Sequence, residues 1–298
     1  MNFLIAGGTG LVGQALINQL VKDNHTVYCL TRNYSKQNDT PNIHYIPWLN
    51  NELPAYPFPS IDIVVNLAGY SLNSGRWTKQ RKQVILSSRL QTTTELLAII
   101  NRLPTMPSLL LNASAVGIYG TSESMCFNES SPLGDDFLAN TVKDWEACAH
   151  NAKNYSIRTV FCRFGLVLSN KGGALPKLVL PYRYFLGGRL GTGNQWVSWI
   201  HIEDVVEGLL YIANHPTIEG PVNFTSPHPV KMSELGRKIS SHLKRPNWFT
   251  VPDCLLKIVL GEMSILITKG QHVRPTVLLE NGYTFKHTEI GEVIKNLY

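Results

Sequence analysis

Residues 3–13 read FLIAGGTGLVG, a short apolar run that leads directly into a cluster of glycines. The run predicts a buried β-strand over Phe3–Ala6, and the apolar spacing that follows predicts a helix over residues 11–22. The glycines satisfy two related patterns, G-x-G-x-x-G and G-x-x-G-x-x-G, through Gly7, Gly8, Gly10 and Gly13. Glycines between a first strand and a first helix are typical of a dinucleotide-binding turn.

The chemistry of such a turn explains why it needs glycine. A tight turn without side chains lets the backbone approach a pyrophosphate closely, and the free N–H groups and positive dipole at a helix start attract the anion. The alternative is an incidental glycine turn. Because the pattern begins at residue 7, directly after the first strand, we favour the dinucleotide site.

Short apolar runs rich in β-branched residues recur further along the chain, separated by segments with helical spacing. The predicted strands cover residues 25–30, 61–67, 108–113 and 158–168, with a helix over 144–152. Such alternation indicates βαβ units around a parallel sheet. We therefore predict an α/β protein with a doubly wound parallel-sheet Rossmann fold. The Pro- and Asn-rich residues 38–59 are expected to form an irregular connection around one short strand near 43–46.

The pattern changes after about residue 170. Glycine-punctuated loops at 172–173 and 187–193 mix with isolated helices, which suggests a smaller lobe on the substrate side. The last segment starts with Val251-Pro252 and has helical spacing of its own. We predict a Rossmann domain over residues 1–247, with the substrate-side lobe mainly after 170, and a C-terminal appendage over 248–298.

Composition excludes several classes of protein. Charged residues make up 16% and apolar residues 44% of the 298 positions, which excludes a disordered, highly charged scaffold. The net charge of +6 is spread without a basic run, which argues against nucleic-acid binding and gives weak support to an anionic ligand. The chain has five cysteines, an odd number, and none of them forms a C-x-x-C pair. Neither a disulfide framework nor a zinc site is therefore expected.

Two further features bear on location. Residues 1–6 lack the basic segment and longer apolar core of a secretory signal. No stretch has the roughly 18 uninterrupted apolar residues of a membrane span. We expect a cytoplasmic protein without membrane contact.

The end of the second predicted strand bears on which dinucleotide binds. An NAD site usually places an Asp or Glu about twenty residues after the glycines, where it binds the ribose hydroxyls. Here Thr31 and Arg32 take that place. A guanidinium can pair with a 2′-phosphate, and no carboxylate is present to repel it. We predict NADP(H) in preference to NAD(H); the alternative is an exposed loop arginine.

Longer motifs resemble those of the extended short-chain dehydrogenase/reductase superfamily. Residues 66–69 (NLAG), 114–120 (SAVGIYG) and 200–205 (IHIEDV) are similar to its fourth-strand, fifth-strand and late-domain motifs. More narrowly, the chain resembles the sugar-epimerase-like proteins of the NAD-dependent epimerase/dehydratase family at residues 75–77, 88–90, 145–147, 172–176, 191–196 and 199–202. Residues from about 251 to 297 resemble the C-terminal domain of unknown function of these proteins. The resemblance covers essentially the whole chain.

The resemblance implies a Rossmann domain that binds NADP. It assigns to the cofactor the residues Gly7, Thr9, Gly10, Leu11, Val12, Gly13, Thr31, Arg32, Leu67, Ala68, Gly69, Arg89, Gly165 and Leu166. Arg89 lies on a predicted helix, where an arginine is more often solvated than bound, so only the resemblance favours it as a ligand.

The acid–base half of the superfamily pattern is missing. Its chemistry normally relies on a Ser or Thr and on Tyr-x-x-x-Lys, in which the Tyr transfers a proton and the Lys lowers the pKa of that Tyr. With Glu146 as the last residue of Y-x-x-x-K-x-x-x-E, the two positions hold Leu138 and Val142, which cannot transfer a proton. The candidate catalytic substitutes are Ser114 and Tyr119. The alternatives are a simple strand-end hydroxyl and a loop tyrosine packed over the cofactor.

Three polar residues of later motifs have structural alternatives. His201 and Asp204 have i, i+3 spacing, but two ligands are too few for a metal. We expect Asp204 to cap a helix over 205–213 and His201 to pack at the lobe junction. Arg163, at the end of the sixth predicted strand, could meet an anionic substrate or form an ion pair with Asp62 or Asp204.

Two functions fit these observations. The first is an NADP(H)-dependent oxidoreductase or epimerase for a small polar, sugar-like substrate, with a non-standard proton donor. The second is a non-catalytic NADP(H)-binding regulatory module, which would fit the cell-division label that some members of the resembling family carry. The superfamily often pairs through helices beside the sheet, so a homodimer stays open.

Overall fold

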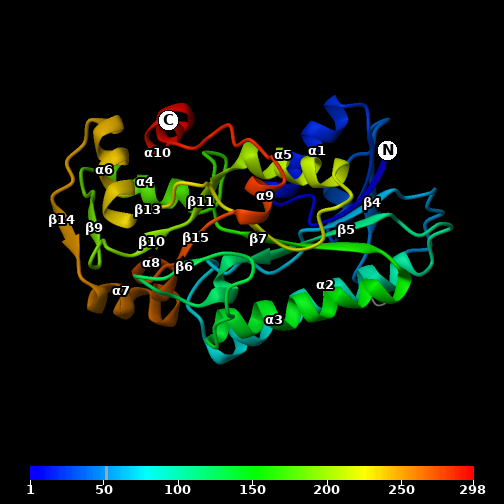
Figure 1. The fold of residues 1–298 in the computed structure, drawn as a ribbon, viewed down its shortest axis with the longest axis horizontal. Helices are drawn as coiled ribbons and strands as arrows, with labels where there is room; N and C mark the ends of the chain where they lie inside the picture. Colours follow the sequence, from blue (N-terminus) through cyan, green and yellow to red (C-terminus); the bar gives the residue numbers. More distant parts are fainter. Residues whose placement is uncertain (51–52) are drawn as a thin grey trace.

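Seven parallel strands form the main sheet, in the order β12-β7-β5-β4-β1-β2-β3 (Figure 1). They are β1 (Asn2–Ala6), β2 (Thr26–Thr31), β3 (Ile43–Pro47), β4 (Ile63–Asn66), β5 (Leu109–Ala115), β7 (Arg158–Phe164) and β12 (Gly220–Phe224). The computed structural model describes residues 1–50 and 53–298. The strand order reverses between β1 and β4, which confirms the predicted doubly wound α/β fold.

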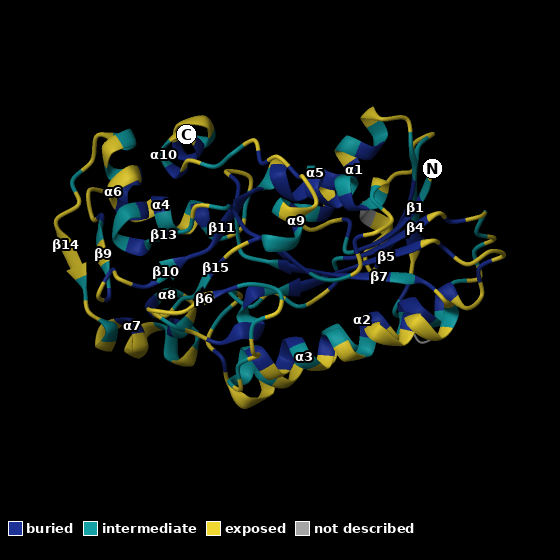
Figure 2. Cartoon of the chain, in the orientation of Figure 1, coloured by how far each residue is buried: buried dark blue, intermediate teal, exposed yellow. Residues whose placement is uncertain are grey.

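Helices cover both faces of this sheet. α1 (Leu11–Lys22) and α5 (Ile202–Asn214) lie on one face, and α2 (Lys79–Ile100) and α3 (Phe137–His150) lie on the other (Figure 1). Alternate residues of β1 point to opposite faces of the sheet and so to different helix layers. Phe3 and Ile5 pack in the cluster of α1 and α5, whereas Leu4 and Ala6 pack in the cluster of α2. Figure 2 shows buried strands between helices whose outer faces are exposed.

The substrate-side lobe is built from short paired strands. β8 (Leu166–Leu168) pairs with β11 (Trp199–His201), β9 (Gly188–Leu190) with β14 (Phe249–Val251), and β10 (Trp196–Val197) with β13 (Val230–Lys231). The helices α4 (Leu175–Arg183) and α6 (Met232–Leu243) supply residues to a hydrophobic cluster around the fully buried Trp199. The lobe therefore has a hydrophobic cluster of its own.

The single strand predicted over 158–168 is two strands. The chain leaves the main sheet after Phe164 and enters the lobe at Leu166. Gly165 lies at the break, where a Cβ atom would come 2.3 Å from the carbonyl oxygen of Ser198. The break depends on this contact with a distant segment, which local spacing does not reveal.

Two helices begin earlier than predicted because of their caps. Asp136 caps α3, since its carboxylate accepts the N–H of Ala139 at 2.8 Å. His201 caps α5, since its Nδ1 accepts the N–H of Glu203 at 3.3 Å.

The expectation that Asp204 caps α5 is wrong. Its buried carboxylate instead accepts the N–H groups of Lys286 and His287, at 2.8 and 3.0 Å. Asp204 thereby ties the first turn of α5 to the C-terminal segment.

The C-terminal segment packs into both parts of the molecule. It comprises α7 (Asp253–Leu260), α8 (Ile265–Thr268), β15 (His272–Val273), α9 (Thr276–Glu280) and α10 (Ile290–Leu297). β15 pairs with β6 (Cys126–Phe127). Leu278, Tyr283 and Phe285 join the cluster beneath α1 and α5, and Ile290, Val293 and Ile294 join the lobe cluster. The segment therefore completes the hydrophobic core.

Short single-turn helices occur in the connections: η1 (Tyr34–Lys36), η2 (Val116–Tyr119), η3 (Asn151–Tyr155) and η4 (Gly261–Ser264). The connection over 38–59 contains β3, as predicted; residues 51 and 52 of it lie outside the described residues. Within the described part of the chain, no helix has both the length and the apolar character that crossing a bilayer requires.

Candidate functional site

The predicted glycine turn lies at the carboxyl end of β1 and fits glycine alone at its key positions. Gly7 has a φ of +80°, and a Cβ there would come 2.6 Å from the carbonyl group of Leu67. A Cβ on Gly13 would come 2.4 Å from the Gly7 carbonyl oxygen. Both glycines therefore permit a close approach of backbones, which is the property that a pyrophosphate cradle needs.

The start of α1 has the electrostatic character expected of an anion site. No side chain caps the helix, and its first turn contains no acidic residue. Thr9 and Gly10 are exposed, and Leu11 and Val12 are half-buried. The N–H groups and positive dipole end of this 12-residue helix are thus available to a phosphate. The residues present fit a dinucleotide.

Thr31 and Arg32 lie beside this turn, at the carboxyl end of β2. Thr31 is buried, and its hydroxyl accepts the N–H of Asn33 at 3.2 Å. Arg32 is exposed, and no described residue forms an ion pair with it. The guanidinium is therefore free to take an external anion.

Leu67, Ala68 and Gly69 follow β4, next to Gly7. The turn is shaped by the buried Asn66, whose side-chain oxygen accepts the N–H of Ala68 at 3.3 Å. The Asn66 amide donates to Asn112 and Thr93 at 2.7 and 3.0 Å. Gly69 is exposed beyond this network.

Arg89 of α2 lies against Gly69 and is not the solvated arginine that its helical position suggests. Its Nη1 donates to the carbonyl oxygens of Tyr70 and Ile85 at 3.1 and 2.8 Å, and its Cζ lies 5.0 Å from the centre of the Trp145 ring. Burial lowers its pKa to about 10. Arg89 thus holds the loop after β4 through its hydrogen bond to the Tyr70 carbonyl oxygen.

Gly165 and Leu166 lie where the chain crosses from the sheet to the lobe, and the Leu166 N–H donates to Ser198 at 2.8 Å. A little further on, a Cβ on Gly173 would come 3.2 Å from Leu11 of the glycine turn. The lobe therefore reaches the start of α1. The structure brings the predicted cofactor residues together along the carboxyl edge of β1, β2, β4 and β7.

Ser114 and Tyr119, by contrast, lie in a buried polar network. Each of the two residues is only 3% exposed. The Ser114 hydroxyl donates to Glu146 at 2.5 Å, and the Tyr119 hydroxyl donates to Asn223 at 2.8 Å. Their catalytic role stays a prediction, and both hydroxyl groups are already bonded within the protein.

Arg163 holds this network together, and neither predicted partner is correct. It binds both carboxylate oxygens of Glu146 at 2.9 Å and donates to the Tyr119 hydroxyl at 2.9 Å. Burial alone would lower the pKa of Arg163, but Glu146 outweighs it and raises that pKa. Burial raises the pKa of Tyr119. Glu146 and Arg163 thus form a salt bridge that joins α3 to β7.

The positions of the missing Tyr and Lys are apolar in the structure as well. Leu138 packs near Gly117, with its Cβ 3.6 Å from where a Gly117 Cβ would lie. Val142 is buried in a cluster with Ile118 and Phe127. No proton donor is hidden at either position.

Tyr70 is a candidate that no motif of the sequence marks. It directly follows Gly69, and Arg81 donates to its hydroxyl at 3.2 Å. A hydrogen bond with Ser74 and the positive charge of Arg81 lower the pKa of Tyr70. Burial has the opposite effect on other tyrosines, raising the pKa of Tyr28, Tyr45, Tyr119, Tyr182, Tyr283 and Tyr298. Tyr70 therefore has the phenol-and-cation chemistry of the missing pair.

The loop that carries Tyr70 reaches from the sheet edge to the lobe. Arg76 donates to the carbonyl oxygen of Val259 at 2.9 Å, at the end of α7. Lys177 of α4 donates to the Asn73 carbonyl oxygen at 3.4 Å. The backbone of Tyr70 is itself fixed, because its N–H donates to the Ser88 hydroxyl at 3.1 Å. Residues 70–77 thus connect the end of β4 with α4 and α7.

A trio of potential metal ligands occurs at the start of α5. Ligand atoms of His201, Glu203 and His287 all lie within 4.8 Å of one another. Because His201 Nδ1 accepts the N–H of Glu203, the proton of its neutral ring is on Nε2. A metal would have to displace that proton. We interpret the trio as a junction between α5 and the C-terminal segment.

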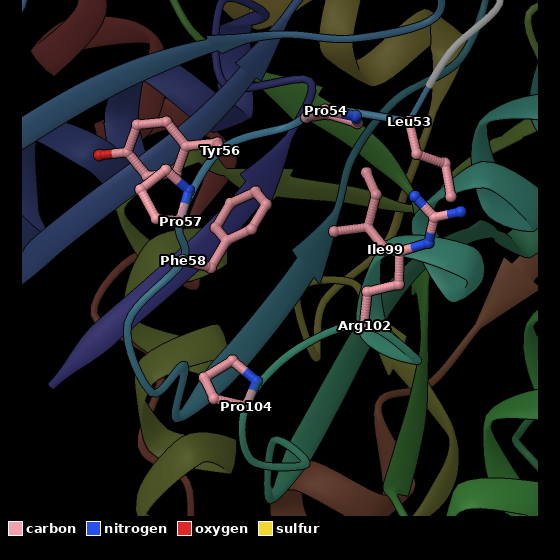
Figure 3. Close-up of a pocket in the computed structure, with 8 residues that line it drawn as sticks. All are labelled: Leu53, Pro54, Tyr56, Pro57, Phe58, Ile99, Arg102 and Pro104. Carbon is pink, nitrogen blue, oxygen red and sulfur yellow. The ribbon is translucent and has the colours of Figure 1, made fainter.

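Two surface cavities lie away from the glycine turn. One, of about 220 Å³, is lined by three prolines, two aromatic side chains and Arg102 between the loop over 53–58 and the end of α2 (Figure 3). It lies at the amino ends of β4 and β5, the edge opposite the glycine turn. The other, of about 350 Å³, lies in the lobe between β9, α6 and residues 247–250.

A doubly wound sheet with a glycine turn under an uncapped helix start defines a dinucleotide-binding protein of the Rossmann class. Residues 3–223 match the model of the NAD dependent epimerase/dehydratase family, and residues 251–297 match a domain of unknown function (DUF1731). The chain therefore belongs to the NAD dependent epimerase/dehydratase family, as the motifs indicate.

Relatives match over the whole chain. Epimerase family protein YfhF of Bacillus subtilis (strain 168) is 42% identical, over 100% of this chain and 98% of the relative. The structure of human epimerase family protein SDR39U1 (isoform 2) with NADPH is 33% identical, with a TM-score of 0.90, over 100% of this chain and 99% of that one. A UDP-galactose 4-epimerase, 16% identical with a TM-score of 0.74 over 100% of this chain and 97% of its own, shares the fold alone.

Proposed function

We propose that the protein is an NADP(H)-dependent oxidoreductase or epimerase that acts on a small polar, sugar-like substrate. One observation carries the proposal: the glycine cradle at the start of α1 lies beside Arg32, which is exposed at the end of β2. The human relative whose structure contains NADPH supports the same cofactor.

Each part of the site has its own role in binding the cofactor. The glycine turn and the start of α1 would bind the pyrophosphate, and Arg32 the 2′-phosphate. Arg89 would hold the loop of Leu67–Gly69 against the cofactor. A bound nicotinamide would supply hydride transfer to or from a substrate carbon.

Tyr70 is the proton donor or acceptor in this proposal. Its hydroxyl accepts a hydrogen bond from Arg81, and the phenol proton is the one that it would transfer. Its lowered pKa brings it closer to the working range of a general acid–base group. Ser114 and Tyr119 would have a structural role and would fix the ends of β5 and β7.

Arg32→Ala should weaken NADPH binding by about tenfold to a hundredfold, the effect of one charged hydrogen bond, and should leave NADH binding unchanged. The measurement is a fluorescence titration with each dinucleotide. Arg102→Ala is the matched control, because Arg102 is also exposed but lies at the opposite edge of the sheet. Equal NADPH affinity in the two variants would contradict the assignment of Arg32.

Tyr70→Phe should reduce NADPH oxidation with a pool of sugar-like carbonyl compounds by about a hundredfold or more, because general acid catalysis is lost. NADPH affinity should not change, because the substitution removes only the hydroxyl. Tyr184→Phe, at a tyrosine 68% exposed in the lobe, is the control. Full turnover by Tyr70→Phe would exclude the assignment.

The pKa of Tyr70 provides a test that needs no substrate. Tyrosine-selective ¹³C NMR should show one resonance, absent in Tyr70→Phe, that titrates below the other tyrosines. Arg81→Gln should raise that pKa, because the cation that stabilises the phenolate is removed. A Tyr70 resonance that titrates with the other tyrosines would contradict the proposed pairing.

The alternative is a non-catalytic NADP(H)-binding regulatory module. The absence of the Tyr and Lys at Leu138 and Val142 favours it, as does the burial of Ser114 and Tyr119. NADPH binding without turnover of any carbonyl compound would support the module, whereas turnover that depends on Tyr70 would support the enzyme.

A further inference from the structure

The cysteines of this chain fall into distinct environments. Cys29 and Cys162 are buried, and burial raises the pKa of both thiols, that of Cys29 to about 11. Cys148 is half-buried, within 3.9 Å of the Leu90 carbonyl oxygen. Cys126 and Cys254 are exposed. Of the five thiols, these last two are the most open to a reagent from solution.

Cys126 differs from Cys254 in having an imidazole partner. Its Sγ lies 2.9 Å from Nδ1 of His272. The backbone enforces this contact, because β6 and β15 pair in parallel with His272 directly opposite Cys126. Within the described residues, Cys254 makes no comparable contact, although it lies in the first turn of α7.

The His272 ring is held in place by its neighbours. The ring of Trp196 packs edge-on against it, with 4.5 Å between ring centres. The chain on either side is also fixed, since the Ser122 N–H donates to Gly270 at 2.9 Å and the Val273 N–H donates to the Ser198 hydroxyl at 2.9 Å. Nδ1 therefore stays directed at the thiol.

Two cations, Lys231 and Arg274, lie near the pair and would attract an anionic reagent. Lys231 lies over the Trp196 ring, with its Nζ 3.7 Å from the ring centre. Burial, Lys231 and Arg274 lower the pKa of His272, so the ring is neutral near pH 7 and its Nδ1 can accept a hydrogen bond from the thiol. The acidic group near Lys231 is Glu123, which offsets part of this positive charge.

We infer that Cys126 and His272 form a reactive thiol–imidazole pair that takes up small anionic disulfides by thiol–disulfide exchange. The Cys126 proton moves to His272 Nδ1, and the Sγ thiolate attacks one sulfur of the disulfide. A new sulfur–sulfur bond forms as the old one breaks, and the departing thiolate takes the proton from the imidazolium. The products are a mixed disulfide on Cys126 and one free thiol.

The site is separate from the proposed dinucleotide site. It lies at the junction of β6 with β15, where the C-terminal segment inserts between residues 122–127 and 196–198. The exchange requires neither a bound dinucleotide nor turnover of a substrate.

The test is exposure of the whole protein to glutathione disulfide near pH 7, followed by peptide mass spectrometry. Cys126 should be modified about tenfold or more faster than Cys254 in the same molecule, since both are exposed and only one has a base. Cystamine, a cationic disulfide, should show a smaller preference for Cys126. Cys254→Ser should leave the rate at Cys126 unchanged.

His272→Phe keeps an aromatic ring against Trp196 and removes the base. It should reduce the rate at Cys126 to that of Cys254, which serves as an internal reference for correct folding. His272→Gln provides a second variant with a polar side chain. Equal rates at Cys126 and Cys254 in the unmodified protein, or an unchanged rate at Cys126 in both His272 variants, would overturn the inference.

Discussion

His201 is a buried histidine that is neutral in the folded protein above about pH 4. It is 3% exposed, and its Nδ1 caps α5. Burial, followed by the nearby His287, lowers its pKa to about 4 from an ordinary value of 6.5. Because the unfolded chain binds the extra proton first, stability should fall as the pH drops from 6.5 toward 4 and should not fall further on account of this group.

His201→Asn tests this linkage. Asparagine keeps an acceptor for the helix cap but does not titrate. The unmodified protein should lose on the order of 3 kcal/mol of unfolding free energy between pH 6.5 and pH 4 because of His201. The variant should lose correspondingly less. Urea unfolding measured across this pH range checks the predicted loss. The control is His242→Asn, at a half-buried histidine of α6. Equal acid sensitivity of the two variants would refute the role of His201.

At the scale of elements, local spacing predicts those strands and helices whose boundaries local interactions set. The strand over 3–6, the helix over 11–22 and the glycines between them follow from residues adjacent in the chain, and the structure confirms all three. The break at Gly165 depends on Ser198, and the early start of α3 depends on a cap outside its apolar stretch. Neither cause is visible as periodicity.

The candidate site divides in the same way. The grouping of the predicted cofactor residues follows from the sequence because most of them lie at strand ends, where a parallel sheet brings them together. The pairing of Arg163 with Glu146, the burial of Ser114 and Tyr119, and the contact of Tyr70 with Arg81 arise between elements. Sequence spacing alone pairs none of these side chains.

At the scale of the whole molecule, the C-terminal segment is part of the core. Leu278, Tyr283 and Phe285 are 0%, 6% and 7% exposed among residues of the main sheet and its helices. Removing them would expose apolar surface worth on the order of 10 kcal/mol when the lobe contacts are included. That is comparable to the whole stability of a typical domain.

Deletion of residues 248–298 should therefore abolish cooperative thermal unfolding, measured by circular dichroism. Adding residues 248–298 as a separate chain should restore it at least in part, which separates loss of packing from a general failure to express. A truncated protein that unfolds cooperatively by itself would show instead that residues 1–247 fold without the segment.

The sequence by itself determined the parallel α/β fold, the glycine cradle and the absence of the usual Tyr and Lys. These depend on backbone conformation, residue size and the chemistry of single side chains, which are local properties. Tertiary structure alone decided that Ser114 and Tyr119 are buried, that Tyr70 meets Arg81 and that Cys126 meets His272. Each of those outcomes depends on how separate elements pack, because only packing sets the distance and dielectric between groups that the chain holds apart.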